Sequence, residues 1–168
     1  ETVDADRIRR TPLITAWRID RAKWSKQASF SGEGAVIEGG RWGHPGTRMV
    51  YTSETLSLAA MEKFVNEGDE GRVVNFVSYR IAIPSHVRIE ELKREDLPAD
   101  WKAVPAPQST MDIGTNWVEK AHSSVLKVPS VVIETEHNYL LNPIHPDFKR
   151  LKISAPKSFE FDSRMWKN

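Results

Sequence analysis

The sequence contains no cysteine among its 168 residues. Disulfide bonds, thiolate zinc sites and cysteine nucleophiles are therefore excluded, and the absence fits a reducing compartment, so we expect a cytoplasmic protein. Long apolar runs are also missing, because no stretch approaches the ~18 consecutive apolar residues of a membrane-spanning helix. The first residues lack the apolar segment of a secretory signal. We therefore expect no membrane partner.

An excess of either charge is missing as well. The chain carries 24 basic and 23 acidic residues, a net charge of +1. This balance gives no broad positive surface for a phosphate backbone, so we expect no direct contact with nucleic acid. The length suits one domain, and a chain of this size can bury roughly two thirds of its unfolded surface. We assign residues 1–12 to an N-terminal extension and residues 13–168 to a single domain.

Several nucleotide and metal motifs are incomplete or absent. Gly32-Glu33-Gly34 starts like a dinucleotide-binding fingerprint, but Ile37 stands where the third glycine is required. The chain has no Gly-Lys-Ser/Thr phosphate loop and no Gly-x-Ser-x-Gly nucleophile turn. Its five histidines lack the HExxH spacing of a zinc site. We therefore expect no metal and no bound cofactor.

Short apolar segments separated by glycine and proline are typical of β-strands. They do not alternate with helices as regular βαβ units. This pattern predicts an α+β fold with a mixed, largely antiparallel sheet and a few helices, rather than a doubly wound sheet. We predict strands at residues 13–19, 48–52, 72–83, 87–92, 126–134, 151–154 and 159–162.

Fewer segments favour helices. We predict them at residues 21–27, at 55–66 with Ser53 or Thr55 as the cap, and around Trp117 at 109–123, where Gly114 weakens the pattern. The remaining segments are predicted as loops: a long glycine-rich loop at 28–47 that can hold a short strand at 35–37, and the stretches 93–108 and 135–148.

One carboxylate stands at an unusual position. Apolar residues cover most of the circumference of the 55–66 helix, so we predict that this helix is largely buried. Glu62 lies one turn after Leu58 and Ala59. A carboxylate there must be paired or must face a cavity, because burying it bare costs several kcal/mol. A structural ion pair and a carboxylate that faces a pocket both remain open.

Candidate partners for this carboxylate lie upstream. Arg41 follows two glycines, which allow the backbone to approach a ligand, and a guanidinium can grip a phosphate or carboxylate with two hydrogen bonds. Tyr51 ends the strand that leads into the helix. Arg18 lies in the apolar first strand, where it is either solvent-facing or a buried anion ligand. Each of these residues also has an ordinary structural interpretation.

Three polar residues lie among apolar neighbours near the end of the chain. Ser130 places a lone hydroxyl inside an apolar strand and must find a partner, usually the backbone. Asn138 and Asn142 lie in a loop that also holds two prolines and three large apolar residues. Such a loop is ordered, and its amides either bind backbone or contact a ligand.

The order of these segments resembles the RES domain, a family named for an arginine, a glutamate and a serine. The resemblance rests on AWRI (16–19), GGRWGHPGTRMVYTSETLSLAAMEKFV (39–65), KVPSVVIETEHNYLLNPIHPDF (127–148) and FEFDSRMW (159–166). It implies a fold like that of ADP-ribosyltransferase toxins and a role as the toxin of a bacterial toxin–antitoxin pair. It also implies that NAD is a substrate and that a helix-turn-helix (Xre-like) antitoxin binds the chain and blocks its pocket.

The resemblance assigns residues to the site. Arg41, Glu62 and Ser130 match the name-giving triad and are the expected catalytic residues. The expected NAD-binding residues are Arg18, Arg41, Tyr51, Ser130, Asn138 and Asn142. Two neighbours depart from the family pattern, since Gly43 stands where asparagine is usual and Asn66 where histidine is common.

The residue types suggest a mechanism for cleaving the bond between nicotinamide and ribose in NAD. Nicotinamide in NAD is already a cationic leaving group, so one carboxylate, Glu62, can stabilise the oxocarbenium-like ribose. Arg41 and Arg18 would hold the diphosphate, and Tyr51 would wall in the nicotinamide. Ser130 would orient an arginine or a ribose hydroxyl, because no histidine base can be placed beside it.

The acceptor of the ADP-ribosyl group stays open between water, phosphate and a host protein side chain. Protein-modifying transferases often carry a second acidic residue two positions before the catalytic one, and Ala60 occupies that position here. A non-catalytic antitoxin-binding module is a further alternative.

Overall fold

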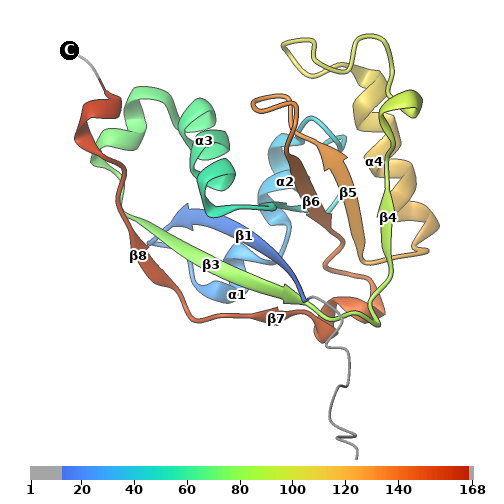
Figure 1. Cartoon of the computed structure of the whole chain (residues 1–168), viewed down its shortest axis with the longest axis horizontal. Helices are drawn as coiled ribbons and strands as arrows, with labels where there is room; N and C mark the ends of the chain where they lie inside the picture. Colours follow the sequence, from blue (N-terminus) through green and yellow to red (C-terminus); the bar gives the residue numbers. More distant parts are fainter. Residues whose placement is uncertain (1–12, 167–168) are drawn as a thin grey trace, which may run out of the picture.

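The structure, a computed structural model, describes residues 13–166 and shows an α+β fold (Figure 1). Its sheet has the strand order β4-β5-β6-β2-β1-β3-β7, and β8 also pairs with β3. All pairings are antiparallel except that between β4 and β5. This confirms the predicted fold class. The strands are β1 (Ile14–Arg21), β2 (Val50–Ser53), β3 (Phe76–Ile83), β4 (Ile89–Glu91), β5 (Val125–Pro129), β6 (His137–Leu141), β7 (Lys152–Ile153) and β8 (Lys157–Phe159).

The helices are short, and α3 is the one that matters most for the site. It begins at Thr55, whose hydroxyl accepts a hydrogen bond from the Leu58 amide, and it ends at Gly68, whose positive φ of 56° suits glycine. The α-helices are α1 (Lys26–Ser29), α2 (Glu33–Glu38), α3 (Leu56–Glu67) and α4 (Gln108–Lys120), and four 3₁₀ segments span Gly68–Val73, Arg94–Asp96, Pro146–Arg150 and Ser163–Met165.

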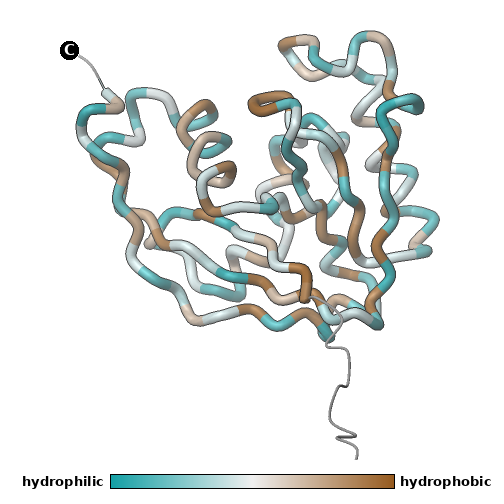
Figure 2. Tube along the Cα trace, in the orientation of Figure 1, coloured by the Kyte–Doolittle hydropathy of each residue, from teal (hydrophilic) through white to brown (hydrophobic). Residues whose placement is uncertain are grey.

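The sheet curls at β2. β1 and β3 pair along their whole length, whereas β1 meets β2 only at Trp17 and Ser53. The half with β1 and β3 carries α3, and the half with β5 and β6 packs against α4 (Figure 1). One apolar cluster joins both halves through Val50, Tyr79 and Leu141. The buried centres of β3, β5 and β6 are apolar in Figure 2.

Two segment predictions are wrong at the level of element type. The 35–37 segment, predicted as a short strand in a loop, lies inside helix α2, which starts after Gly32 in the left-handed conformation and ends at Gly39. The 135–148 segment, predicted as a loop, contains β6 in the middle of the sheet. Its polar residues conceal the strand, because Asn138 faces a cleft while Leu140 and Leu141 are fully buried.

Other boundaries shift. The predicted helix at 21–27 is a turn followed by α1, because Ser25 caps the helix only from Lys26. The strand predicted from residue 72 begins at Phe76, because residues 68–73 form a 3₁₀ segment. The strand predicted to residue 134 ends at Pro129. A serine cap, a 3₁₀ segment that begins at a glycine and a proline set these three boundaries, whereas an apolar run marks only the strand's centre.

The predicted burial of α3 is also wrong. Only Leu58 and Ala59 of this helix are buried, and Val65 is 59% exposed. One side of the helix packs on β1 and another lines a cleft. Phe64 finds its partners in the C-terminal segment, with ring centroids 6.1 Å from Phe161 and 5.4 Å from Trp166.

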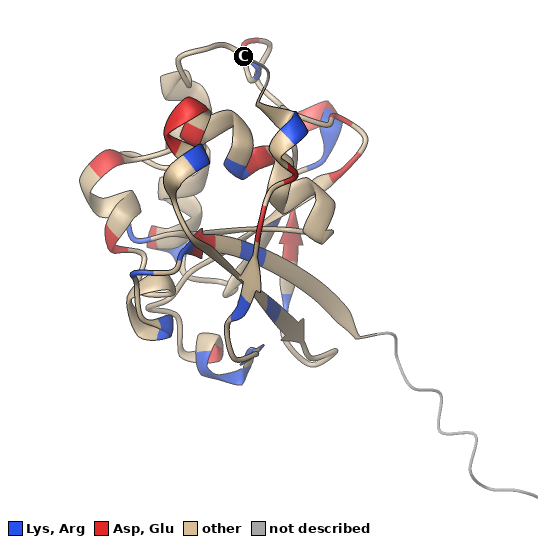
Figure 3. Cartoon of the chain, turned by 90° about the vertical axis from the view of Figure 1, so that its left-hand side faces the viewer, with Lys and Arg blue, Asp and Glu red and all other residues tan. Residues whose placement is uncertain are grey.

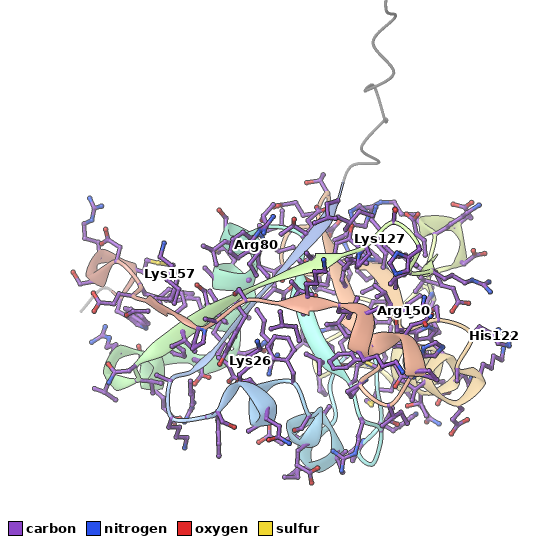
Figure 4. All side chains as sticks on the ribbon, turned by 90° about the horizontal axis from the view of Figure 1, so that it is seen from below. Lys26, Arg80, His122, Lys127, Arg150 and Lys157 are labelled. Carbon is purple, nitrogen blue, oxygen red and sulfur yellow. The ribbon has the colours of Figure 1, made fainter. Side chains whose placement is uncertain are left out.

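Surface charges of both signs are interspersed on the side that carries α3 and β8 (Figure 3). Seen from below, the outer side of β3 and β8 presents Arg80 and Lys157, while Lys26 donates to the Ile153 carbonyl (Figure 4). No helix among residues 13–166 is both long and apolar enough to cross a membrane. The proposed extension, residues 1–12, lies outside the described residues.

Candidate active site

Glu62 lines two adjoining hollows. The smaller has a volume of about 150 Å³ and includes Arg18, and the larger has a volume of about 860 Å³ and includes Arg41. We call the two together the cleft. Both hollows also share Tyr51, Lys63, Asn66 and Asn138 with Glu62.

The larger hollow is lined on one side by α3 and on the other by the loop before α4 and the loop after β5. Figure 1 shows these segments facing each other. Two loop tips, at residues 104–106 and 131–132, form the wall opposite α3, and both are apolar in Figure 2. Val104 in the first of them is 86% exposed. The cleft therefore offers apolar contact on one wall and charge on the other.

Neutral groups hold Glu62 in place. Ser130 Oγ donates to Glu62 Oε1 at 2.8 Å, and Asn138 Nδ2 donates to the same oxygen at 2.7 Å. Within residues 13–166, no protein donor contacts Oε2 and no ion pair includes Glu62. Of the two interpretations left open by the sequence, the structure shows a carboxylate that faces a cavity.

The geometry around Ser130 directs its hydroxyl hydrogen. This fully buried side chain accepts hydrogen bonds from the amides of Val132 at 3.0 Å and Ile133 at 3.1 Å. Its only hydrogen therefore points to Glu62. The structure thus differs from the expectation that Ser130 orients an arginine or a ribose hydroxyl. Its partner is the carboxylate itself.

Arg41 lies in the loop between α2 and β2. Its Nη1 donates to the carbonyl oxygens of Trp101 and Ala103, both at 2.9 Å. Burial lowers the pKa of Arg41, although the nearby negative charge of Glu62 acts in the opposite direction. Arg41 nevertheless stays charged at neutral pH, because the ordinary pKa of an arginine lies far above 7. Within the described residues no carboxylate pairs with it, so its charge is available to an anion in the cleft.

The Arg41 loop packs tightly against Tyr51. A Cβ atom at Gly40 would lie 2.8 Å from Cζ of Tyr51, so only glycine fits there. Tyr51 Oη accepts a hydrogen bond from the Trp42 amide at 3.3 Å. Burial raises the pKa of Tyr51 to about 12, so the ring is neutral and forms an uncharged wall of the cleft.

The same loop docks on α4 through Gly114. A Cβ atom at this position would overlap the Trp42 carbonyl oxygen and would lie 2.7 Å from the Trp42 carbonyl carbon. Thr115 Oγ1 accepts from the His44 amide at 3.0 Å, and the His44 ring meets Asp112 at 2.6 Å. The glycine that weakens the helical pattern is therefore what allows α4 to support the Arg41 loop.

Arg18 enters the smaller hollow from β1. Its Nη1 donates to the Tyr51 carbonyl at 3.0 Å, and its Nη2 pairs with Asp20 at 3.0 Å. Its buried Nε has no hydrogen-bond partner among residues 13–166. Because Asp20 already neutralises part of its charge, Arg18 is a weaker anion site than Arg41.

A charge network that the sequence analysis missed lines the cleft beside Glu62. Lys63 Nζ lies 3.1 Å from Glu67 and 3.9 Å from Asp20, and Arg21 Nη2 lies 2.6 Å from Glu67. Burial acts to raise the pKa of Glu67, but hydrogen bonds from Arg21 and Lys63 outweigh it and hold this pKa below its ordinary value. The i, i+4 spacing of Lys63 and Glu67 is a signal that could have found the network.

Replacing Glu67 by glutamine is expected to give a pH-dependent loss of stability. Because the pKa of Glu67 is lowered on folding, its contribution is present above the unfolded pKa near 4.5 and is lost as pH falls through the folded value. The contribution is about 1 kcal/mol or less, because Arg21 is partly exposed. Thermal melting should show a gap between the two proteins at pH 7 that closes below pH 4.5. An equal gap at both pH values would contradict this origin.

Of the two asparagines predicted to bind NAD, one lies in the cleft and the other does not. Asn138 reaches Glu62, as described above. The structure does not bring Asn142 to the cleft, because this fully buried side chain accepts from the Ile144 amide at 3.2 Å and lines neither hollow. Ser53 was missed, although it lies two residues after Tyr51 on β2 and hence on the same face.

Candidate metal ligands do not cluster in the described part of the chain. Within residues 13–166, no three side chains of histidine, aspartate or glutamate gather closely enough to hold an ion. The cleft is lined by the Glu62 carboxylate, by the guanidiniums of Arg18 and Arg41, by the charge network beside Glu62 and by neutral hydrogen-bonding groups.

Comparison with a solved structure supports the fold. A chain in the crystal structure of the M. tuberculosis MbcT–MbcA toxin–antitoxin complex superposes with a TM-score of 0.68, covering 88% of this chain and 85% of the other. The two are 15% identical in sequence. At that identity the likeness establishes a shared fold.

Sequence comparisons extend over most of the chain. A protein named Toxin Res from Yersinia enterocolitica is 40% identical over 139 residues, covering 82% of this chain and 91% of the relative. A Toxin Res from Photorhabdus laumondii is 39% identical over 153 residues, covering 90% and 96%. A Prs ADP-ribosylating toxin from a Sphingobium species is 34% identical over 152 residues, covering 89% and 94%. The RES domain profile matches residues 15–162, and with these relatives it shows that the chain belongs to the RES domain family.

Proposed function

We propose that this chain is the toxin of a toxin–antitoxin pair and that it cleaves the bond between nicotinamide and ribose in NAD. The observation that carries the proposal is the arrangement of Glu62. One carboxylate oxygen accepts from two neutral donors and the other is open to the cleft. Arg41 lines the same cleft, and no carboxylate in the described part of the chain pairs with it. The names of the relatives as toxins support this assignment.

The reaction needs a negative charge beside the ribose. When the bond between C1′ and the pyridinium nitrogen breaks, its electron pair returns to the ring and leaves neutral nicotinamide, so no general acid is required. Positive charge develops on C1′ and the ring oxygen, as in glycoside hydrolysis. The open Oε2 of Glu62 stabilises this charge and orients the incoming nucleophile, which forms the new bond at C1′.

The other cleft residues bind and orient NAD. Arg41 holds the diphosphate with its free guanidinium edge, and Arg18 adds a second, partly neutralised cation. Tyr51 provides an uncharged wall against the nicotinamide. NAD is thus the substrate and no cofactor takes part. The partner is an antitoxin of the helix-turn-helix, Xre-like class that covers the cleft.

Product analysis of NAD turnover tests the proposal. The purified chain without antitoxin should release one nicotinamide for each NAD consumed. Free ADP-ribose in phosphate-free buffer identifies water as the acceptor, and ADP-ribose phosphate formed only with added phosphate identifies phosphate. NAD that stays unchanged after prolonged incubation would contradict the proposal and would favour a non-catalytic antitoxin-binding module.

Transfer to a protein is the second candidate function. The relative named as a Prs ADP-ribosylating toxin favours it, whereas Ala60 stands two positions before Glu62, where such transferases often carry a second acidic residue. NAD labelled in its adenylate half distinguishes the two candidates when the toxin is incubated with a host extract. Label on a protein band supports transfer, and label only in small molecules supports NAD degradation.

Replacing Arg41 by lysine should raise the KM for NAD by roughly tenfold or more with a smaller change in kcat. Lysine keeps the charge but loses the planar fork that binds the two carbonyls and a phosphate together. Steady-state nicotinamide release measures both constants. Arg48→Lys is the matched control, because Arg48 pairs with Glu33 outside the cleft. An unchanged KM in Arg41→Lys would contradict the diphosphate role.

A further inference from the structure

Ser53 is a buried hydroxyl on the cleft side of β2 that the mechanism above does not use. It is 4% exposed and lies directly opposite Asn138 in the β2–β6 register. Its Oγ donates to Asn138 Oδ1 at 2.8 Å. Asn138 in turn donates to Glu62. A continuous chain of hydrogen bonds therefore runs from Ser53 to the carboxylate.

The chemistry of each group determines the direction of this chain. A carboxylate only accepts hydrogen bonds, so the amide nitrogen of Asn138 must face Glu62. The amide oxygen is then turned to the other side, where it needs a donor. Ser53 is the group that supplies one. Without it the oxygen would be left unsatisfied, and the amide would be free to rotate away from Glu62.

Two supports thus converge on the same oxygen of Glu62. On one side the amides of Val132 and Ile133 fix Ser130, and on the other side Ser53 fixes Asn138. Both deliver a donor to Oε1. With Oε1 held by two donors, the carboxylate cannot turn without losing one, and Oε2 stays directed to the cleft.

We propose that Ser53 is a positioning residue that acts through Asn138 to fix the orientation of Glu62 toward the ribose of NAD. The inference rests on the proposed function for its kinetic consequence, but its structural step, from Ser53 to Asn138, stands apart from any reaction.

Kinetics test the first consequence. Ser53→Ala should lower kcat about tenfold, the effect of losing one buried hydrogen bond, with little change in the KM for NAD. In an Asn138→Ala background the same replacement should have no further effect, because the group through which Ser53 acts is gone. Ser78→Ala is the matched control, since Ser78 is a buried serine on β3 that bonds to the Lys157 carbonyl.

NMR of the side-chain amide of Asn138 tests the structural step without NAD. Its two ¹⁵N-bound protons, assigned by their loss in Asn138→Ala, should shift and exchange faster with water in Ser53→Ala and not in Ser78→Ala. If Ser53→Ala does not fold, Ser53→Cys replaces it, because it keeps the volume and offers only a weak donor.

The two measurements separate the two claims. If the wild-type chain leaves NAD intact, the proposed function fails and the NMR result alone decides whether Ser53 fixes Asn138. Unchanged Asn138 signals in the Ser53 variant would overturn the inference. So would an equal loss of kcat with and without Asn138, because Ser53 would then act by another route.

Discussion

Glu62→Gln is expected to slow nicotinamide release by on the order of 10²-fold or more, with the fold intact. The amide oxygen of glutamine can still accept from Ser130 and Asn138, so the supports of the side chain remain. What is lost is the negative charge that faces the developing cation on the ribose. The rate of nicotinamide release from saturating NAD measures the effect.

A matched control separates the charge from its position. Glu91→Gln removes one negative charge on β4, where the carboxylate lies 3.9 Å from Lys127 and outside the cleft. This variant should keep the wild-type rate. Thermal melting should place both variants close to the wild-type chain. A Glu62→Gln protein that keeps most of the rate would remove Glu62 from the chemistry.

Gly114→Ala is expected to destabilise the protein and to reduce NAD turnover together. Helix propensity alone predicts the opposite, because alanine in a helix interior is more favourable than glycine by about 1 kcal/mol. The new methyl group, however, would overlap the Trp42 carbonyl and would push the Arg41 loop away from α4. A displacement of about 1 Å in a binding group can cost 10²-fold in rate. Chemical denaturation and nicotinamide release measure the two losses.

The chain offers a second helical glycine as the control. Gly34 lies in α2, and a Cβ atom there would have nothing within 4 Å. Gly34→Ala should therefore be neutral or slightly stabilising, with unchanged turnover. If Gly114→Ala behaves in the same way, the close packing of the Arg41 loop on α4 is not what positions Arg41.

Local patterns predict part of this fold well. The apolar runs of β1, β2 and β3 and the capped helix α3 lie close to their predicted positions, because strand and cap signals are local. β6 escaped prediction because it begins with polar residues, of which Asn138 faces the cleft rather than the core. Its buried pair, Leu140 and Leu141, is too short a signal among asparagines and prolines.

The residues of the candidate site were likewise predicted only in part from the sequence. Residue chemistry and the family resemblance identified Glu62, Arg41, Ser130 and Asn138, and the structure brings all four to one cleft or to its carboxylate. The register of β2 against β6 could not be read from the chain, so Ser53 was considered only as a helix cap and its place opposite Asn138 was missed.

The contact of Gly114 with the Arg41 loop is another tertiary contact that no local sequence pattern predicts. Trp42 and Gly114 are far apart in the sequence, and only the packing of the loop on α4 brings them together. Asn142 shows the converse error. Its residue type suits a ligand, but its Oδ1 accepts from the Ile144 amide in the turn after β6 and its side chain lines neither hollow.

A crystal structure of the Glu62→Gln protein with NAD is the most direct test of the central claim. We predict C1′ of the nicotinamide-bearing ribose within about 3.5 Å of the residue 62 side chain. The diphosphate should lie within hydrogen-bonding reach of the Arg41 guanidinium, and the nicotinamide should lie against Tyr51. NAD bound elsewhere, or bound in the cleft with its ribose turned away from residue 62, would contradict the account.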